Sequence, residues 1–146
     1  FFLRHFGIKR VMLISMFAWV FRFGLFGLGD PGSGLWMLIL SMIVYGMAFD
    51  FFNISGSLFV ELEAKPEIRA SAQGLFFMMT NGLGAIIGGY ASGAVVDAFS
   101  VYSDGMLISR EWPDIWFIFA GYALVIGILF ALVFRYKHQP EELSKK

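Results

Sequence analysis

Four long apolar runs, separated by short polar segments, dominate the sequence. Each run approaches or exceeds the roughly 20 residues that a helix rising about 1.5 Å per residue needs to cross a hydrocarbon core, so each predicts a membrane-spanning helix. The predicted spans are residues 11–28, 35–60, 70–96 and 115–134. The glycine-rich segment 29–34 predicts a tight turn after the first span, and Pro66 ends the helix of the second. The predicted fold class is an all-α membrane protein with four transmembrane helices.

Lysine and arginine concentrate on one set of span ends. Because positive residues near span ends are retained in the cytoplasm, these segments are predicted to be cytoplasmic, and both ends of the chain with them. The predicted cytoplasmic parts are a loop at residues 1–10, a loop at 61–69 and a tail at 135–146. Residues 97–114, with several acidic residues and only Arg110 as a positive charge, are predicted to form a periplasmic loop.

Composition agrees with a membrane protein and excludes several functions. Hydrophobic residues make up 58% of the chain and charged residues 15%, outside the balance of a soluble domain. A formal net charge of zero gives no basic surface for nucleic acid. No cysteine is present, so thiol chemistry and cysteine metal sites are excluded. The sequence does not begin with methionine, and we expect it to be part of a longer protein.

Enzyme chemistry has little support in the sequence. The only histidines, His5 and His138, fall at predicted cytoplasmic ends, so a serine in a span has no histidine base beside it. No spacing of histidine, aspartate or glutamate resembles a metal site, and no cofactor is expected. We therefore predict that the protein is not an enzyme.

Asp50 is the only charged residue in the second span and the leading candidate for function. An ionisable group deep in the bilayer persists mainly where it faces a cavity or a partner. Steps of four, three and four residues place it on a polar face with Gly46, Asn53 and Ser57. Tyr45 and Phe49 occupy the neighbouring stripe. Rings can stack on a base or sugar while a carboxylate accepts hydrogen bonds from ribose hydroxyls, so one helix could bind substrate and carry a coupling proton.

Other polar residues in the spans are secondary candidates. Arg22 could pair with Asp50 and hold two helices together, could extend its charge toward an interface, or could contact substrate. Gln73 and Asn81 in the third span could face a cavity or form hydrogen bonds between helices. The ladders Gly84–Gly88 and Ala85–Gly89–Gly93 predict close helix packing.

Several segments resemble the bacterial nucleoside:proton symporters of the major facilitator superfamily, of the nucleoside permease G type. The most specific is Ser41–Ser57, which includes Tyr-Gly-Met-Ala-Phe-Asp and is similar to the signature of helix ten. Residues 4–10 resemble the basic loop before helix nine. Residues 68–74 and 78–82 resemble helix eleven, and residues 118–122 the start of helix twelve.

The resemblance implies that the four spans are helices nine to twelve of a twelve-helix transporter that takes up nucleosides with protons across the inner membrane. It implies that Tyr45, Phe49 and Asp50 contribute to the nucleoside pocket. The implied partners are protons, a nucleoside such as uridine or adenosine, the remaining eight helices and the lipid bilayer. A carrier for another solute, such as a sugar or drug, and a self-contained four-helix membrane scaffold remain the alternatives.

Overall fold

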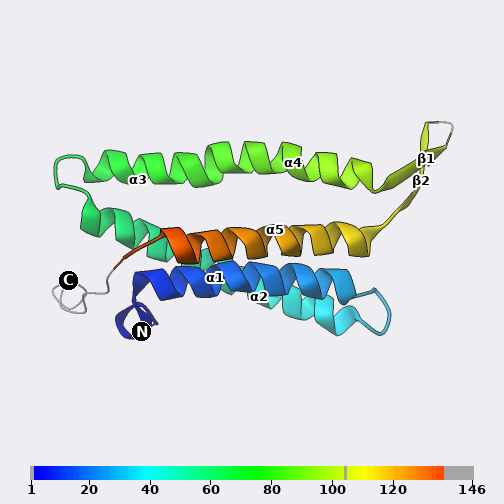
Figure 1. Ribbon diagram of the computed structural model, residues 1–146, viewed down its shortest axis with the longest axis horizontal. Helices are drawn as coiled ribbons and strands as arrows, with labels where there is room; N and C mark the ends of the chain where they lie inside the picture. Colours follow the sequence, from blue (N-terminus) through cyan, green and yellow to red (C-terminus); the bar gives the residue numbers. More distant parts are fainter. Residues whose placement is uncertain (1, 104, 137–146) are drawn as a thin grey trace.

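The computed structural model describes residues 2–103 and 105–136 and contains long helices and one short hairpin (Figure 1). The predicted tail therefore lies outside the described residues from position 137 onward, as does Asp104. In chain order the elements are α1 (Phe2–Leu28), α2 (Leu35–Glu63), α3 (Arg69–Phe77), the π-helical segment η1 (Met78–Leu83), α4 (Gly84–Ala98), β1 (Ser100–Ser103), β2 (Met106–Arg110) and α5 (Trp112–Val133).

The first helix begins earlier than predicted. Residues 1–10 were expected to form a loop, but helix α1 starts at Phe2 and is broken by Gly7, whose φ of 77° lies in the left-handed region that glycine adopts readily. Hydropathy marks where the chain becomes apolar, whereas a helix can continue with charged residues into water. The basic segment is therefore helical on both sides of a sharp break.

Helices α1 and α2 pack along a seam of small and apolar side chains. On α1 the buried positions Ile8, Val11, Met12 and Ser15 follow the spacing of a single helical face. On α2 the fully buried residues recur at steps of seven, as Ser41, Ala48 and Ser55. Small residues on one helix let the two backbones approach closely, which is the usual basis of helix association in membranes.

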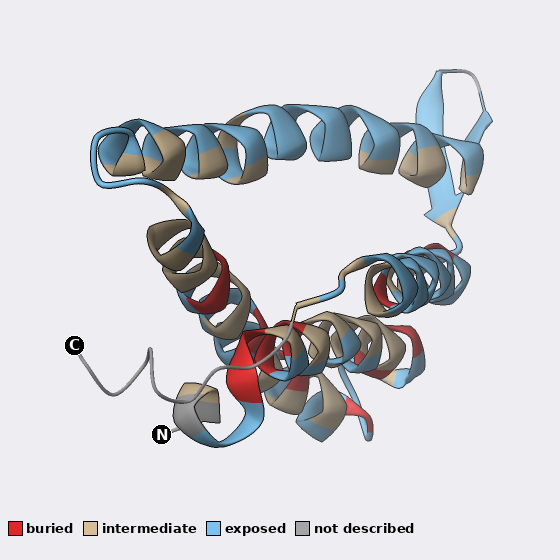
Figure 2. Ribbon diagram, turned by 60° about the vertical axis from the view of Figure 1, so that its left-hand side comes forward, coloured by how far each residue is buried: buried red, intermediate tan, exposed pale blue. Residues whose placement is uncertain are grey.

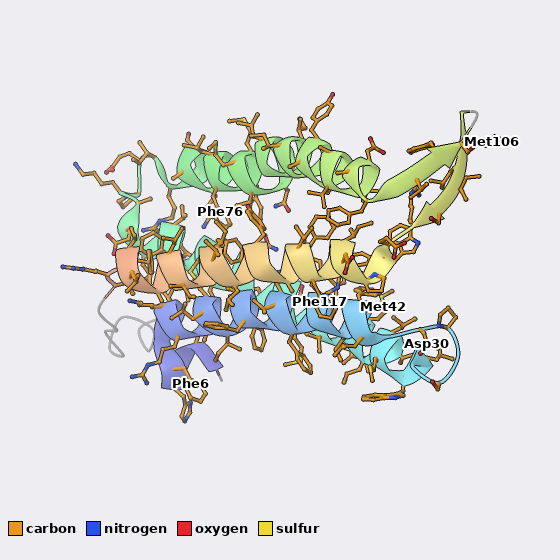
Figure 3. All side chains as sticks on the ribbon, turned by 45° about the vertical axis from the view of Figure 1, so that its right-hand side comes forward. Phe6, Asp30, Met42, Phe76, Met106 and Phe117 are labelled. Atoms are coloured by element: carbon orange, nitrogen blue, oxygen red, sulfur yellow. The ribbon has the colours of Figure 1, made fainter. Side chains whose placement is uncertain are left out.

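Helix α5 packs on the other side of α1. A Cβ atom built at Gly27 would lie only 3.1 Å from the Phe117 ring, so the absence of a side chain there admits the ring (Figure 3). Phe26 stacks on Trp116 with ring centroids 4.7 Å apart. Lys9 Nζ donates a hydrogen bond of 2.9 Å to the Ala131 carbonyl, where a positive charge complements the carboxyl end of the α5 helix.

The third long helix stands apart from the other three. It runs through α3, η1 and α4 as one rod and contains no buried residue in any of its three parts (Figure 2). Its main contact is at its beginning, where Phe76 of α3 points toward α2 (Figure 3) and packs on Gly56, at which even a Cβ atom would overlap the ring. The predicted continuous helix at residues 70–96 is thus interrupted in hydrogen-bond register, though not in direction.

Two connections lie at the end of the molecule opposite the start of α1 and the end of α5 (Figure 1). In the turn after α1, the Asp30 carboxylate accepts hydrogen bonds from the backbone N–H groups of Gly32 (2.6 Å) and Gly34 (3.1 Å). The predicted loop at residues 97–114 contains an antiparallel hairpin, with Ser103 paired to Met106 and Gly105 at a φ of 78°. An Asp-Gly pair between short apolar runs is a hairpin signal that hydropathy reading passed over.

Within the described residues, four helices are long and apolar enough to cross a membrane: His5–Leu28, Leu35–Glu63, Arg69–Ala98 and Trp112–Val133. The N-terminal end of α1 and the carboxyl end of α5 lie at the same end of the molecule, as the charge distribution predicted (Figure 1). The predicted fold class, an all-α membrane protein with four spanning helices, is confirmed. Which end faces the cytoplasm stays a prediction.

Candidate functional site

The candidate residues of the second span lie on the more exposed part of α2, with Tyr45 at the edge that contacts α1. Asp50 is exposed and Asn53 is half-buried. Tyr45 keeps 39% of its surface exposed and Phe49 40%, whereas the neighbouring Ala48 is fully buried. The face predicted from helical spacing is therefore the exposed face of α2 within the described chain.

Aromatic rings form a continuous row from α1 to this face. Trp19 of α1 meets Tyr45 of α2 edge to face at a centroid distance of 5.5 Å. Tyr45 in turn lies 5.9 Å from Phe49, with the two ring planes tilted by 40°. Such rings can stack on a base or a sugar face. Sequence reasoning missed Trp19, although its position three residues before Arg22 places both on one side of α1.

Arg22 does not pair with Asp50. Among the described residues its guanidinium lies instead over four rings, the nearest being Tyr45 at 4.4 Å from the ring centroid. Its Nε atom is buried and has no hydrogen-bond partner within the described chain. The negative faces of aromatic rings attract a cation, which explains how Arg22 is accommodated in an apolar span without a carboxylate. The pairing considered from the sequence is thus replaced by an aromatic environment.

Asn53 and its neighbours border a groove between α2 and α3. The side-chain amide of Asn53 donates to the Phe49 carbonyl at 2.9 Å, which fixes it along its own helix. The groove has a volume of about 380 Å³ and adjoins the polar face of α2 on the side toward the third helix. Its lining residues are Asn53, Ile54, Ser57, Leu58, Glu61 and Phe77.

Gln73 forms the hydrogen-bonded contact between α2 and α3. Its Nε2 atom donates to the Ser57 carbonyl at 2.6 Å, and its Oε1 atom accepts from the Ser57 hydroxyl at 3.0 Å. The sequence left open whether Gln73 faces a cavity or forms hydrogen bonds between helices, and the structure shows the hydrogen bonds between helices. Gln73 thereby holds the start of the third helix against the candidate face.

Asn81 lies in the π-helical segment η1 and is exposed. Its amide donates to the Thr80 hydroxyl at 3.2 Å, and that hydroxyl donates to the Phe76 carbonyl at 2.8 Å. The structure does not bring Asn81 into contact with the α2 face. π-Helical turns occur often at functional sites, but no feature of the sequence indicated one here. The glycine ladder that follows is also exposed, so the close packing predicted for it is not made with the described part of this chain.

No metal site is present in the part of the chain that the structure describes, where no group of three or more potential ligands occurs. The site therefore consists of a carboxylate, two rings and an amide on one helix, flanked by an arginine enclosed in rings. Long apolar helices with exposed polar side chains within one of them define the class of the protein as a multi-span membrane protein.

Comparison with known proteins gives the family. Residues 1–139 match the family model described as nucleoside H⁺ symporter, and the chain belongs to this family. The xanthosine permease of Escherichia coli (strain K12) is 56% identical over 147 residues, covering 100% of this chain and 34% of that protein. The nucleoside permease NupG of the same organism is 56% identical over 139 residues, covering 94% of this chain and 32% of NupG.

The fold agrees with the same family. The crystal structure of the nucleoside transporter NupG superimposes with a TM-score of 0.83 at 56% sequence identity, covering 94% of this chain and 33% of that one. The chain thus spans about a third of the length of the relatives it matches. The predicted membership of the nucleoside:proton symporters is confirmed.

Proposed function

We propose that this chain forms helices nine to twelve, the C-terminal third, of a proton-coupled transporter that takes up nucleosides across the bacterial inner membrane. The substrate face is the open side of α2. Tyr45 and Phe49 stack on the nucleoside, and Asn53 and Asp50 hydrogen-bond it. Asp50 also carries the coupling proton. Both ends of the chain are cytoplasmic in this proposal.

The observation that carries the proposal is the exposure of Asp50 beside two partly exposed rings in a membrane-spanning helix. A carboxylate facing lipid would cost a few kcal/mol by insertion scales, so this face is expected to adjoin water or protein. Membership of the nucleoside H⁺ symporters supports a nucleoside and a proton as the species that meet there.

The third helix supports the view that further helices complete the protein. The rod formed by α3, η1 and α4 buries no residue in the described chain. It nevertheless carries the exposed polar residue Asn81 and, after it, the exposed glycine ladder. Small-residue ladders serve close helix contacts in membranes. The remaining eight helices of a twelve-helix carrier would supply such contacts, which favours a carrier over a self-contained four-helix scaffold.

A transporter rather than an enzyme is the function that these residues support. The candidate face offers binding groups and a titratable carboxylate, and transport requires no covalent step. The relatives are named permeases, and one of them is named for xanthosine. Xanthosine therefore belongs in any substrate panel, beside uridine and adenosine.

The decisive experiment is Asp50→Asn in the complete open reading frame that contains this chain. Asparagine keeps the size and much of the hydrogen bonding but cannot exchange a proton, so concentrative uptake of labelled nucleoside should be lost while the protein remains in the membrane. Asp97→Asn, at the exposed end of α4, is the matched control and should transport normally. Full concentrative uptake by the Asp50 variant would disprove the assigned role.

A competition assay separates nucleosides from other solutes. Unlabelled nucleosides, sugars and drugs are each added in excess to the wild-type transporter during uptake of labelled uridine. We expect nucleosides alone to compete. Inhibition by a sugar or a drug at similar concentration, with none by nucleosides, would assign the chain to a different carrier.

A further inference from the structure

The half-buried guanidinium of Arg22 lies close to four aromatic rings, an arrangement called here the aromatic box. Trp19, Phe23 and Phe26 come from its own helix, with ring centroids 5.0, 5.7 and 5.3 Å from its guanidinium carbon. The fourth and nearest ring is Tyr45, at 4.4 Å, and it belongs to α2. Arg22 is therefore the cation that links α1 to the candidate substrate face.

The electrostatics of this box favour a fixed position for the guanidinium. Within the described chain Arg22 forms no ion pair, and its buried Nε atom has no partner. Arg22 is half-buried within an apolar span, and the negative potential of the surrounding ring faces stabilises its charge. Because Tyr45 is the nearest ring, moving it away from Arg22 would leave the positive charge of the guanidinium less stabilised. The attraction thus restrains the ring as well as the arginine.

Because Tyr45 is part of the substrate face, the restraint on its ring also affects substrate binding there. Its ring contacts Trp19 on one side and Phe49 on the other, and yet it remains 39% exposed. A ring held by its neighbours while part of its surface stays open is suited to stack on a planar ligand without losing much conformational freedom on binding.

We propose that Arg22 is a positioning residue for substrate binding, acting through Tyr45 without touching the substrate. The inference rests on the proposed function, since it assigns Arg22 a part in the same site. It replaces two of the three hypotheses that the sequence left open for Arg22, a direct substrate ligand and an ion-pair partner of Asp50; the third was extension of its charge toward an interface. The planar guanidinium matters as well as its charge, because it can lie parallel to a ring while an ammonium cannot.

A double-mutant cycle in the complete transporter tests this mechanism. The variants are Arg22→Met, Tyr45→Ala and the double variant, and the measurements are KM and maximal rate for uridine uptake, normalised to transporter in the membrane. Arg22→Met should raise KM about tenfold, with the maximal rate changed far less. In the Tyr45→Ala background the same substitution should change KM by less than about twofold, because the group through which it acts is gone.

Controls separate this mechanism from general destabilisation. Arg22→Lys keeps a cation and should give a KM between those of the wild type and Arg22→Met. If Arg22→Met does not reach the membrane, Arg22→Lys becomes the deciding variant. An unchanged KM in Arg22→Lys would then overturn the inference. Arg110→Met removes a guanidinium that lies 5.6 Å over Trp112, far from the face, and should leave KM unchanged.

Two results would contradict the inference while leaving the proposed function intact. Additive effects of the Arg22 and Tyr45 substitutions on KM would show that Arg22 contacts the substrate itself. A loss of maximal rate at constant KM would show that Arg22 serves the transport cycle instead of binding. Absence of nucleoside uptake by the wild type would instead disprove the proposed function, so the two failures are distinguishable.

Discussion

The contact between Gln73 and Ser57 allows a quantitative test of the structure. Gln73→Met keeps the length of the side chain and removes both hydrogen bonds, of 2.6 and 3.0 Å, that join α3 to α2. Interhelical hydrogen bonds in membranes average about 0.6 kcal/mol each, so the loss should be about 1 kcal/mol. The Ser57 hydroxyl can turn to a carbonyl of its own helix, which limits any further penalty.

A loss of this size should lower the thermal midpoint by about 1 °C in a transporter about three times as long as this chain, because the entropy of unfolding grows with chain length. The assay is thermal unfolding of the purified full-length transporter in detergent, in which size-exclusion chromatography measures the protein that remains folded after heating. The KM for uridine is measured in parallel. Ser57→Ala removes only the hydroxyl bond and should lower the midpoint by about half as much. KM should stay unchanged in both variants, because Gln73 connects helices and does not bind substrate.

The reasoning would be refuted by the opposite division of effects. If Gln73→Met raised KM several-fold without lowering the midpoint, Gln73 would be a substrate ligand whose contact with Ser57 has little weight in the working protein. A combined Gln73→Met and Ser57→Ala variant gives a further check. It should be no less stable than Gln73→Met alone, because both substitutions remove the same interaction.

Two further predictions concern packing and the first turn. Gly56→Ala should cost about 1–3 kcal/mol of stability through overpacking and lower the thermal midpoint more than Gly121→Ala. A Cβ at Gly56 overlaps the Phe76 ring, whereas a Cβ at Gly121 meets no described atom within 4 Å outside its own stretch of helix. Equal midpoints would argue against this contact. Asp30→Ala should destabilise the protein by about 1–2 kcal/mol, because the N–H groups of Gly32 and Gly34 lose their acceptor. Asp30→Asn keeps one acceptor oxygen and should destabilise it less. An alanine variant more stable than the wild type would contradict the turn geometry.

Hydropathy was sufficient to predict the number and approximate position of the spanning helices, but not their ends. Helix α1 extends to Phe2 and α2 to Glu63, into segments that were expected to be loops. The apolar pattern reports which solvent a residue meets, and a helix can pass from lipid into water without ending. The π-helical segment η1 could not be foreseen for a different reason, since its register differs from that of an α-helix while its composition does not.

The candidate face could be predicted because it depends on a single helix. The spacing of Tyr45, Phe49, Asp50 and Asn53 determines that they share one side of α2 whatever surrounds it. The partners of Arg22 and Gln73 could not be predicted, because each depends on how two helices are rotated against each other. That rotation is a property of the packed interface and has no local signal in the sequence.

The packing of α2 on α1 shows how that rotation is determined. Ser41, Ala48 and Ser55 lie at steps of seven residues and are fully buried, so the side of α2 that they form is the one that can come closest to α1. Asp50 follows Ala48 by two residues and is therefore turned about 200° around the helix axis from it. The buried small residues and the exposed carboxylate are thus two consequences of the same rotation. Tyr45, three residues before Ala48, is turned only about 60° from the buried side. It can therefore reach Arg22 on α1 and still border the open face, which is the geometry that a link between the two requires.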